Sequence, residues 1–140
     1  LGYQKTDGTL IHPDGRKAAF LGDFCDRGPK NAAVLRLVMD MVKSGNAIAV
    51  PGNHDAKLLK YLRGKSVSEA HGMDKTIAEL NACGEEFKAE AASFIDGLIS
   101  HYVLDSFPPN TQPVSIQYVP FRDFTSLSAI WPYTIVALPR

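Results

Sequence analysis

The sequence predicts an α/β protein built on a parallel strand pair, and three segments carry that prediction. Lys17–Leu21 (KAAFL) is a short apolar run that ends at a glycine, which is typical of a buried strand. Residues 31–43 place apolar side chains at helical spacing, and Ala47–Val50 is a second short apolar run. Because a strand, a helix and a strand with short connections form a crossover unit, we expect the two strands to be parallel neighbours.

The other segments predict further helices, a turn and one more strand. His12–Arg16 (HPDGR) predicts a turn, because proline presets φ and Asp-Gly accepts tight-turn geometry. Helices are expected from about residue 55 to 63, at Asp74–Leu80 and over the apolar positions between residues 87 and 98. The run HYVLD at His101–Asp105 predicts a strand.

The composition excludes several classes of protein. The chain has 140 residues, 45% apolar and 21% charged, which suits one globular domain with one core. Fifteen basic residues balance fifteen acidic ones, so extended coating of nucleic acid or binding to a membrane surface is not indicated. Cys25 and Cys83 have neither metal-type nor disulfide spacing. We therefore expect a cytoplasmic protein without a membrane partner.

Polar and charged side chains follow both predicted strands. The first loop reads GDFCDRG and the second reads PGNHD. The carboxyl ends of neighbouring parallel strands meet at one sheet edge, where open α/β proteins bind their ligands. We therefore expect the six polar side chains of these loops to form one site. They are Asp23, Asp26, Arg27, Asn53, His54 and Asp55.

These residue types together suit the hydrolysis of a phosphate ester. A carboxylate can bridge two cations, and a carboxamide oxygen can ligate one of them. A guanidinium fork matches phosphate oxygens, and an imidazole can protonate a leaving oxygen near neutral pH. The alternative is structural: the aspartates cap loops, Arg27 pairs with one of them, and Asn53 and His54 fill a turn. That alternative explains each residue singly but not their joint occurrence at two adjacent strand ends.

The motifs GDFCDRG and GNHD resemble the second and third motifs of the calcineurin-like metallophosphoesterases. The DRG form resembles the branch of the serine/threonine phosphoprotein phosphatases and their bacterial relatives, which more often has Glu where this chain has Asp55. Residues 52–80 resemble the phosphatase domain of bacterial polynucleotide kinase-phosphatases. The resemblance covers about residues 1–105. It implies a β-sandwich flanked by helices, present here as a partial fold whose first strand and C-terminal strands are missing or altered.

The resemblance also implies a role for each matching residue. Asp23 resembles the carboxylate that bridges two metals, and Asn53 resembles an amide ligand of the second metal that also meets the substrate phosphate. Arg27 resembles the residue that binds phosphate oxygens. His54 resembles the general acid for the leaving oxygen, and Asp26 resembles the partner that orients it. The implied supporting residues are Gly22, Gly28, Gly52 and Asp55.

The resemblance implies a metal-dependent hydrolase with two divalent ions, for which manganese is favoured over iron, zinc or nickel. The first reading of its function is hydrolysis of phosphate monoesters at 2′ or 3′ ends of RNA or nucleotides. A kinase or ligase domain fused outside this chain would favour that reading, and Lys57, Lys60 and Arg63 would then meet the nucleic acid, unless they form only a solvated helix face. The alternatives are a phosphoprotein phosphatase or dinucleoside-polyphosphate hydrolase of the same branch, and a non-catalytic remnant.

Parts of the family pattern have no counterpart in this sequence. The first motif, Asp-x-His, would precede Leu1, and the later histidine motifs do not follow Asp105. We therefore expect a fragment that is catalytically incomplete as written, with a partial metallophosphoesterase domain at residues 1–105 and an unassigned tail at 106–140. Within the tail, Ile130–Leu138 is apolar enough for a strand, although WPY interrupts it.

Overall fold

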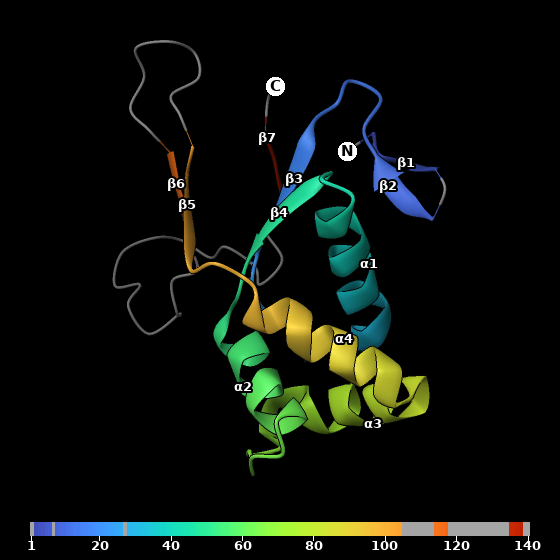
Figure 1. Ribbon diagram of the computed structural model, residues 1–140, viewed down its shortest axis with the longest axis vertical. Helices are drawn as coiled ribbons and strands as arrows, with labels where there is room; N and C mark the ends of the chain where they lie inside the picture. Colours follow the sequence, from blue (N-terminus) through green and yellow to red (C-terminus); the bar gives the residue numbers. More distant parts are fainter. Residues whose placement is uncertain (1, 7, 27, 105–113, 118–134, 139–140) are drawn as a thin grey trace.

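The computed structural model of the chain describes residues 2–6, 8–26, 28–104, 114–117 and 135–138. Its helices lie together beside a small central sheet (Figure 1). The helices are α1 (Asn31–Lys43), α2 (Asn53–Leu62), α3 (Met73–Cys83) and α4 (Glu85–Asp96), with a 3-10 turn η1 at Ala70–Gly72. The strands are β1 (Gln4–Thr6), β2 (Thr9–Ile11), β3 (Lys17–Leu21), β4 (Ala47–Val50), β5 (His101–Leu104), β6 (Val114–Gln117) and β7 (Ile135–Leu138).

The central sheet has the strand order β4-β3-β7. Strands β3 and β4 are parallel, with Ala18 opposite Ala47 and Leu21 opposite Val50, so both strands end at the same edge. This confirms the predicted α/β class and the predicted parallel pair. Strand β7 runs antiparallel along the other side of β3. The pairs β1-β2 and β5-β6 are each antiparallel.

The predicted bounds of β3, α1 and β4 are confirmed to the residue, and the turn at residues 12–16 is closed by a hydrogen bond from the Gly15 N–H to the His12 oxygen of 2.8 Å. The prediction for α2 was wrong at its start, because the helix begins at Asn53 rather than near residue 55. The physical reason is a cap: the Asp55 carboxylate accepts the Gly52 N–H at 2.8 Å and so completes the first turn. Asn53 and His54 are therefore helical residues.

The later elements differ from the prediction mainly in length. Helix α3 extends to Cys83, and α4 ends at Asp96 rather than near residue 98. Strand β5 covers His101–Leu104, and Asp105 lies outside the described residues. The predicted apolar strand at 130–138 corresponds to β7 at Ile135–Leu138, whereas residues 130–134 lie outside the described residues. The hairpin of β1 and β2 was not predicted, because its three-residue strands are too short to show a period.

The core lies between the sheet and the helices. Helix α1 packs on β4 and α3, and α4 packs on α2 and α3. Leu35, Leu58, Met73 and Leu80, one from each of α1 and α2 and two from α3, are completely buried there. Such side chains each contribute roughly 1.5–3 kcal/mol of transfer free energy. Within the residues that the structure describes, no helix is both long enough and apolar enough to cross a bilayer.

Helix α1 is capped by a residue from a distant helix. Its own N-cap residue, Lys30, makes no capping hydrogen bond with its side chain. Instead the Glu79 carboxylate on α3 accepts the backbone N–H of Ala32 and the side-chain amide of Asn31, both at 2.9 Å. Partial burial raises the pKa of Glu79, but these hydrogen bonds lower it by more, so the net shift is downward. The contact ties α3 to the start of the crossover helix.

Removing this cap should destabilise the fold. We expect Glu79→Ala to lower the free energy of unfolding by about 1–2 kcal/mol, because a helix N-terminus loses its carboxylate. Since the folded-state pKa of Glu79 is lowered, the stabilisation is present above the ordinary glutamate pKa of about 4.3 and is lost as the pH falls through the lowered folded-state pKa. Urea unfolding at several pH values measures both effects. Glu90→Ala, at an exposed position of α4, is the control; an equal loss in both variants would contradict the capping role.

Candidate active site

The two loops that follow β3 and β4 are joined by the buried carboxylate of Asp55. It accepts backbone N–H groups from Asp23 at 2.6 Å, Phe24 at 2.9 Å and Gly52 at 2.8 Å. The first two donors belong to the loop after β3, and the third to the loop after β4. The prediction that these loops meet is therefore confirmed.

Burial dominates the electrostatics of Asp55. The side chain is fully buried, and burial raises its pKa to about 6 against the opposing hydrogen bonds from the Gly52 and Phe24 amides. The neighbouring thiol of Cys25 lies 3.8 Å from Oδ1 of Asp55. Burial, followed by the charge of Asp55, raises the pKa of this thiol. Cys25 is thus a protonated packing residue rather than a nucleophile.

Gly22 and Gly52 let the two loop backbones touch. Gly22 has φ of +76°, and a Cβ on it would lie 2.6 Å from the Gly52 Cα and closer still to the Gly52 nitrogen. A Cβ on Gly52 would lie 2.5 Å from the backbone nitrogen of Asp23 and would also overlap its carboxylate. Glycine is therefore required on both sides, and the Asp23 carboxylate packs directly against the Gly52 backbone.

Because the two loop backbones touch at Gly22, Gly22→Ala should destabilise the protein more than alanine at a glycine with open space around it. Gly45 has nearly the same φ, +75°, but a Cβ there meets no atom within 4 Å. We expect Gly45→Ala to cost about 1–2 kcal/mol from backbone strain alone, and Gly22→Ala to cost about 2–5 kcal/mol because a backbone clash is added. Thermal unfolding of both variants measures the difference. Equal costs would mean that the loops do not touch at this point.

Asp23 and Asn53 are the predicted metal ligands, and the geometry places them on the facing ends of the two loops. Asp23 is half-buried with φ of +55°, and its Oδ1 accepts the His54 backbone N–H at 3.1 Å. Asn53 is exposed in the first turn of α2. Carboxylate and carboxamide oxygens are hard donors, and neither side chain is fully buried, so the chemistry of this donor set fits a divalent cation. Among the described residues, no cluster of three or more His, Cys, Asp or Glu is grouped for metal binding.

His54 and Asp26 form a buried hydrogen-bonded pair. Nδ1 of His54 lies 2.5 Å from Oδ2 of Asp26, and the Asp26 side chain is completely buried. Asp26 has φ of +67°, which is unusual for a residue with a side chain. A carboxylate at Nδ1 favours the tautomer with its proton on that nitrogen and leaves Nε2 for another partner. When the ring also carries a proton on Nε2, this imidazolium can deliver that proton to an oxygen.

Thr76 also binds Asp26 of this pair, a contact that the sequence analysis did not predict. Its hydroxyl donates to Oδ1 of Asp26 at 2.6 Å and accepts the Asp26 backbone N–H at 3.1 Å. Thr76 comes from α3, fifty positions away, so loop motifs alone could not reveal it. One signal was available: Thr76 occupies the buried helix face between Met73 and Leu80, where a polar side chain needs a partner.

Most of the chain matches the model of one known protein family. The model of the calcineurin-like phosphoesterases matches residues 5–126. The chain belongs to the calcineurin-like phosphoesterase family. It is therefore a member of a family of hydrolases that use divalent metal ions. The match extends beyond residue 105, and the division of the chain at that point stays a prediction.

This phosphoesterase is similar to several bacterial proteins named bis(5′-nucleosyl)-tetraphosphatase PrpE (asymmetrical). It is 47% identical over 109 residues to the one from Halalkalibacterium halodurans, which covers 77% of this chain and 44% of the relative. It is 42% identical over 88 residues to those from Anoxybacillus flavithermus and Bacillus subtilis, covering 63% of this chain and 36% of each relative. The chain thus spans less than half the length of these relatives. The narrower resemblance to polynucleotide kinase-phosphatases stays a prediction.

Arg27 and Gly28 complete the predicted loop after β3 of this phosphoesterase. Arg27 lies outside the described residues. The backbone N–H of Gly28 donates to the backbone carbonyl oxygen of Asp26 at 2.6 Å. This bond fixes Gly28 beside Asp26, the residue that pairs with His54. The predicted supporting position of Gly28 therefore has a local explanation, whereas the phosphate contact of Arg27 stays a prediction.

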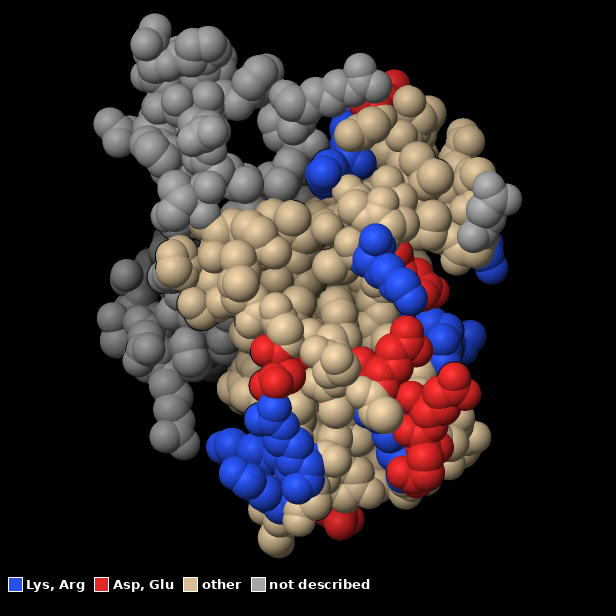
Figure 2. All heavy atoms as spheres, in the orientation of Figure 1, with Lys and Arg blue, Asp and Glu red and all other residues tan. Residues whose placement is uncertain are grey.

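The basic residues of α2 are partly engaged within the protein. Figure 2 shows basic side chains gathered over the region where Figure 1 places α2. Nζ of Lys57 donates to the Ala70 carbonyl oxygen at 3.3 Å, and Arg63 pairs with Asp96 at 2.6 Å. Lys60 is exposed. Both contacts lie at the surface, where such interactions contribute little, and the role of these residues toward nucleic acid stays a prediction.

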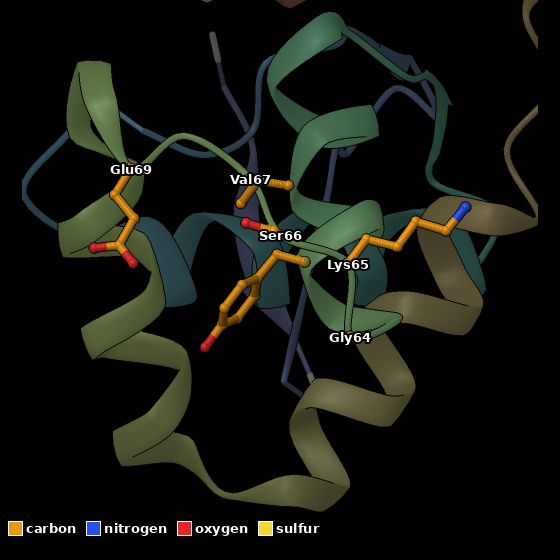
Figure 3. A pocket seen from close by; sticks show the side chains of 6 residues that line it. Gly64, Lys65, Ser66, Val67 and Glu69 are labelled. Carbon is orange, nitrogen blue, oxygen red and sulfur yellow. The ribbon is translucent and has the colours of Figure 1, made fainter.

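A separate pocket of about 310 Å³ lies at the end of α2 (Figure 3). It is lined by Tyr61, Gly64, Lys65, Ser66, Val67 and Glu69. None of these residues belongs to the two loops that form the candidate site. The pocket is therefore not part of the constellation around Asp23 and His54.

Proposed function

We propose that this phosphoesterase hydrolyses dinucleoside tetraphosphates asymmetrically, giving a nucleoside triphosphate and a nucleoside monophosphate. The observation that carries the proposal is the 47% identity over 109 residues to a protein named for this activity. The geometry is compatible with it, because the half-buried Asp23 and exposed Asn53 border an accessible edge beside His54. The proposal also includes a cytoplasmic location, which the free thiols of Cys25 and Cys83 favour.

In this proposal Asp23 and Asn53 hold divalent metal, with manganese as the favoured ion. The metal, when bound, would make water more acidic and would offset the negative charge of the phosphate chain. Asp23 also accepts the His54 backbone N–H. The same carboxylate thereby links the metal position to the helix that carries the proton donor.

His54 is proposed as the general acid and Asp26 as its orienting partner. Nδ1 of His54 faces Asp26 and keeps its proton, so the acid is the imidazolium form, whose Nε2–H can give a proton to the leaving oxygen. Water adds to phosphorus as the phosphorus–oxygen bond to the leaving group breaks, and the proton that water releases replaces the one that His54 donates. Arg27 is proposed to bind the phosphate oxygens through its planar fork, as its place in the DRG motif indicates.

The competing candidate is hydrolysis of phosphate monoesters at 2′ or 3′ ends of nucleic acid. It rests on the likeness of residues 52–80 to polynucleotide kinase-phosphatases and would fit a protein with fused kinase or ligase domains. The first candidate is favoured over it because the relative that matches 77% of this chain is named for the tetraphosphatase activity. A phosphoprotein phosphatase is the third possibility and shares the same loop residues.

A substrate comparison tests these candidates. Activity is measured in a hybrid enzyme in which this chain replaces the aligned segment of the Halalkalibacterium halodurans relative, which supplies the rest of its own sequence. With Mn²⁺ present, we expect diadenosine tetraphosphate to give equal amounts of ATP and AMP on chromatography. RNA with a 3′-phosphate and a phosphopeptide should be cleaved much more slowly. Preference for either of those two substrates, or two molecules of ADP from each tetraphosphate, would contradict the proposal.

A further inference from the structure

Thr76 makes an unusual pair of hydrogen bonds for a buried helical threonine. Such a hydroxyl commonly donates to the carbonyl four residues earlier. Here that acceptor, the Gly72 oxygen, lies 3.4 Å away, whereas Oδ1 of Asp26 lies 2.6 Å away. A hydroxyl has a single proton, and a short bond to a carboxylate is stronger than a long one to a neutral carbonyl. The proton of Thr76 therefore points at Asp26.

The same hydroxyl also holds the backbone of Asp26. Its oxygen accepts the Asp26 N–H at 3.1 Å, so one side chain contacts both the main chain and the carboxylate of one residue. Asp26 adopts φ of +67°, a left-handed conformation that is uncommon for a non-glycine residue, and the bond from its N–H to Thr76 helps to hold it. A group that both donates and accepts is needed for this arrangement, and a hydroxyl meets that need.

These bonds restrict the orientation of the His54 ring. With Oδ1 bound to Thr76, the carboxylate can turn only a little, and Oδ2 is left facing Nδ1 of His54 at 2.5 Å. A carboxylate fixed in this way keeps the proton on Nδ1 and sets the plane of the ring. Both Thr76 and Asp26 are completely buried, so water does not compete for these bonds.

We propose that Thr76 is a positioning residue whose hydroxyl holds Asp26, so that Asp26 fixes the tautomer and orientation of His54. The proposal extends the proposed role of His54 as general acid, and its meaning for catalysis rests on that role. Thr76 acts through Asp26 and needs no contact with substrate.

The test uses the 140-residue chain labelled with ¹⁵N in its histidines, and it needs no catalytic activity. The His54 ring should show one tautomer, with a far-downfield Nδ1–H resonance that exchanges slowly with water. In Thr76→Val we expect this proton to exchange at least about tenfold faster, because a hydrogen bond to a charged group has been removed. Thr76→Ser should keep the slow exchange, since it keeps the hydroxyl.

Two further variants make the result unambiguous. Thr9→Val removes an exposed hydroxyl that lies 3.2 Å from the Ser44 hydroxyl, and it should leave the His54 signal unchanged. If Thr76→Val does not fold, Thr76→Ala makes the same comparison. Slow exchange retained in a folded Thr76→Val or Thr76→Ala, or fast exchange in Thr76→Ser, would overturn the proposal. A hybrid enzyme that does not cleave the tetraphosphate would leave the expected exchange rates of the His54 proton unchanged. Failure of the proposed function and failure of the Thr76 proposal are therefore distinguishable.

Discussion

Replacing Asp23 by asparagine should reduce hydrolysis in the hybrid enzyme by at least about a thousandfold, equivalent to roughly 4 kcal/mol. Asparagine tolerates the left-handed backbone that Asp23 adopts and can still accept the His54 N–H. The loop should therefore keep its shape, and the change should remove only the negative charge that we propose holds metal. Asp23→Ala should be equally inactive and somewhat less stable. Initial rates with a dinucleoside tetraphosphate measure the loss.

The control for this variant is Asp14→Asn. Asp14 is an exposed aspartate in the turn before β3, where its ion pair with Arg16 spans 3.5 Å at the surface. Such a pair contributes little to stability, so the rate should be close to that of the unmodified hybrid. A rate for Asp23→Asn within tenfold of the control would exclude Asp23 as an essential metal ligand.

Replacing His54 by glutamine should give a loss that depends on the leaving group. For an alkyl phosphate, whose leaving oxygen is strongly basic, we expect kcat to fall by about 10²–10⁴-fold. For a dinucleoside tetraphosphate the leaving group is a weakly basic phosphate, so the fall should be about tenfold or less. Rates for a series of alkyl and aryl phosphates, each with the same variant, measure this dependence.

Asp26→Asn is the matched variant for His54→Gln. It keeps the imidazole of His54 but removes the carboxylate that orients it, so its loss of rate should also depend on the leaving group. Equal losses on all leaving groups for His54→Gln would show that the histidine supports binding or folding and does not donate the proton. A loss confined to KM would point to the same conclusion.

The frame of the site could be predicted from the sequence because it depends on short-range patterns. The run KAAFL, the helical spacing of residues 31–43 and the run AIAV specify a crossover, and a crossover fixes where its two loops lie. The proximity of Asp23, Asp26, His54 and Asp55 followed from that topology alone. Their hydrogen bonds confirm the proximity, whereas their chemical roles stay proposals.

The contacts that hold the site in shape could not be predicted, because they join residues far apart in sequence. Thr76 reaches Asp26, and Glu79 reaches the start of α1, from the same helix α3. Nothing in the local spacing of α3 specifies which partner its polar side chains meet. The predicted start of α2 near residue 55 was wrong for a different, local reason: the Asp55 carboxylate caps a helix that starts two residues earlier.

The most direct test of the account is where manganese binds on this chain. In ¹H–¹⁵N spectra of the 140-residue protein, substoichiometric Mn²⁺ should broaden the amide signals of residues 22–26 and 52–55 before others, because a paramagnetic ion acts over a short range. Asp23→Asn should remove that selective broadening. Broadening that persists in Asp23→Asn, or that centres instead on the acidic start of α4 at Glu85 and Glu86, would contradict a metal site formed by the two loops.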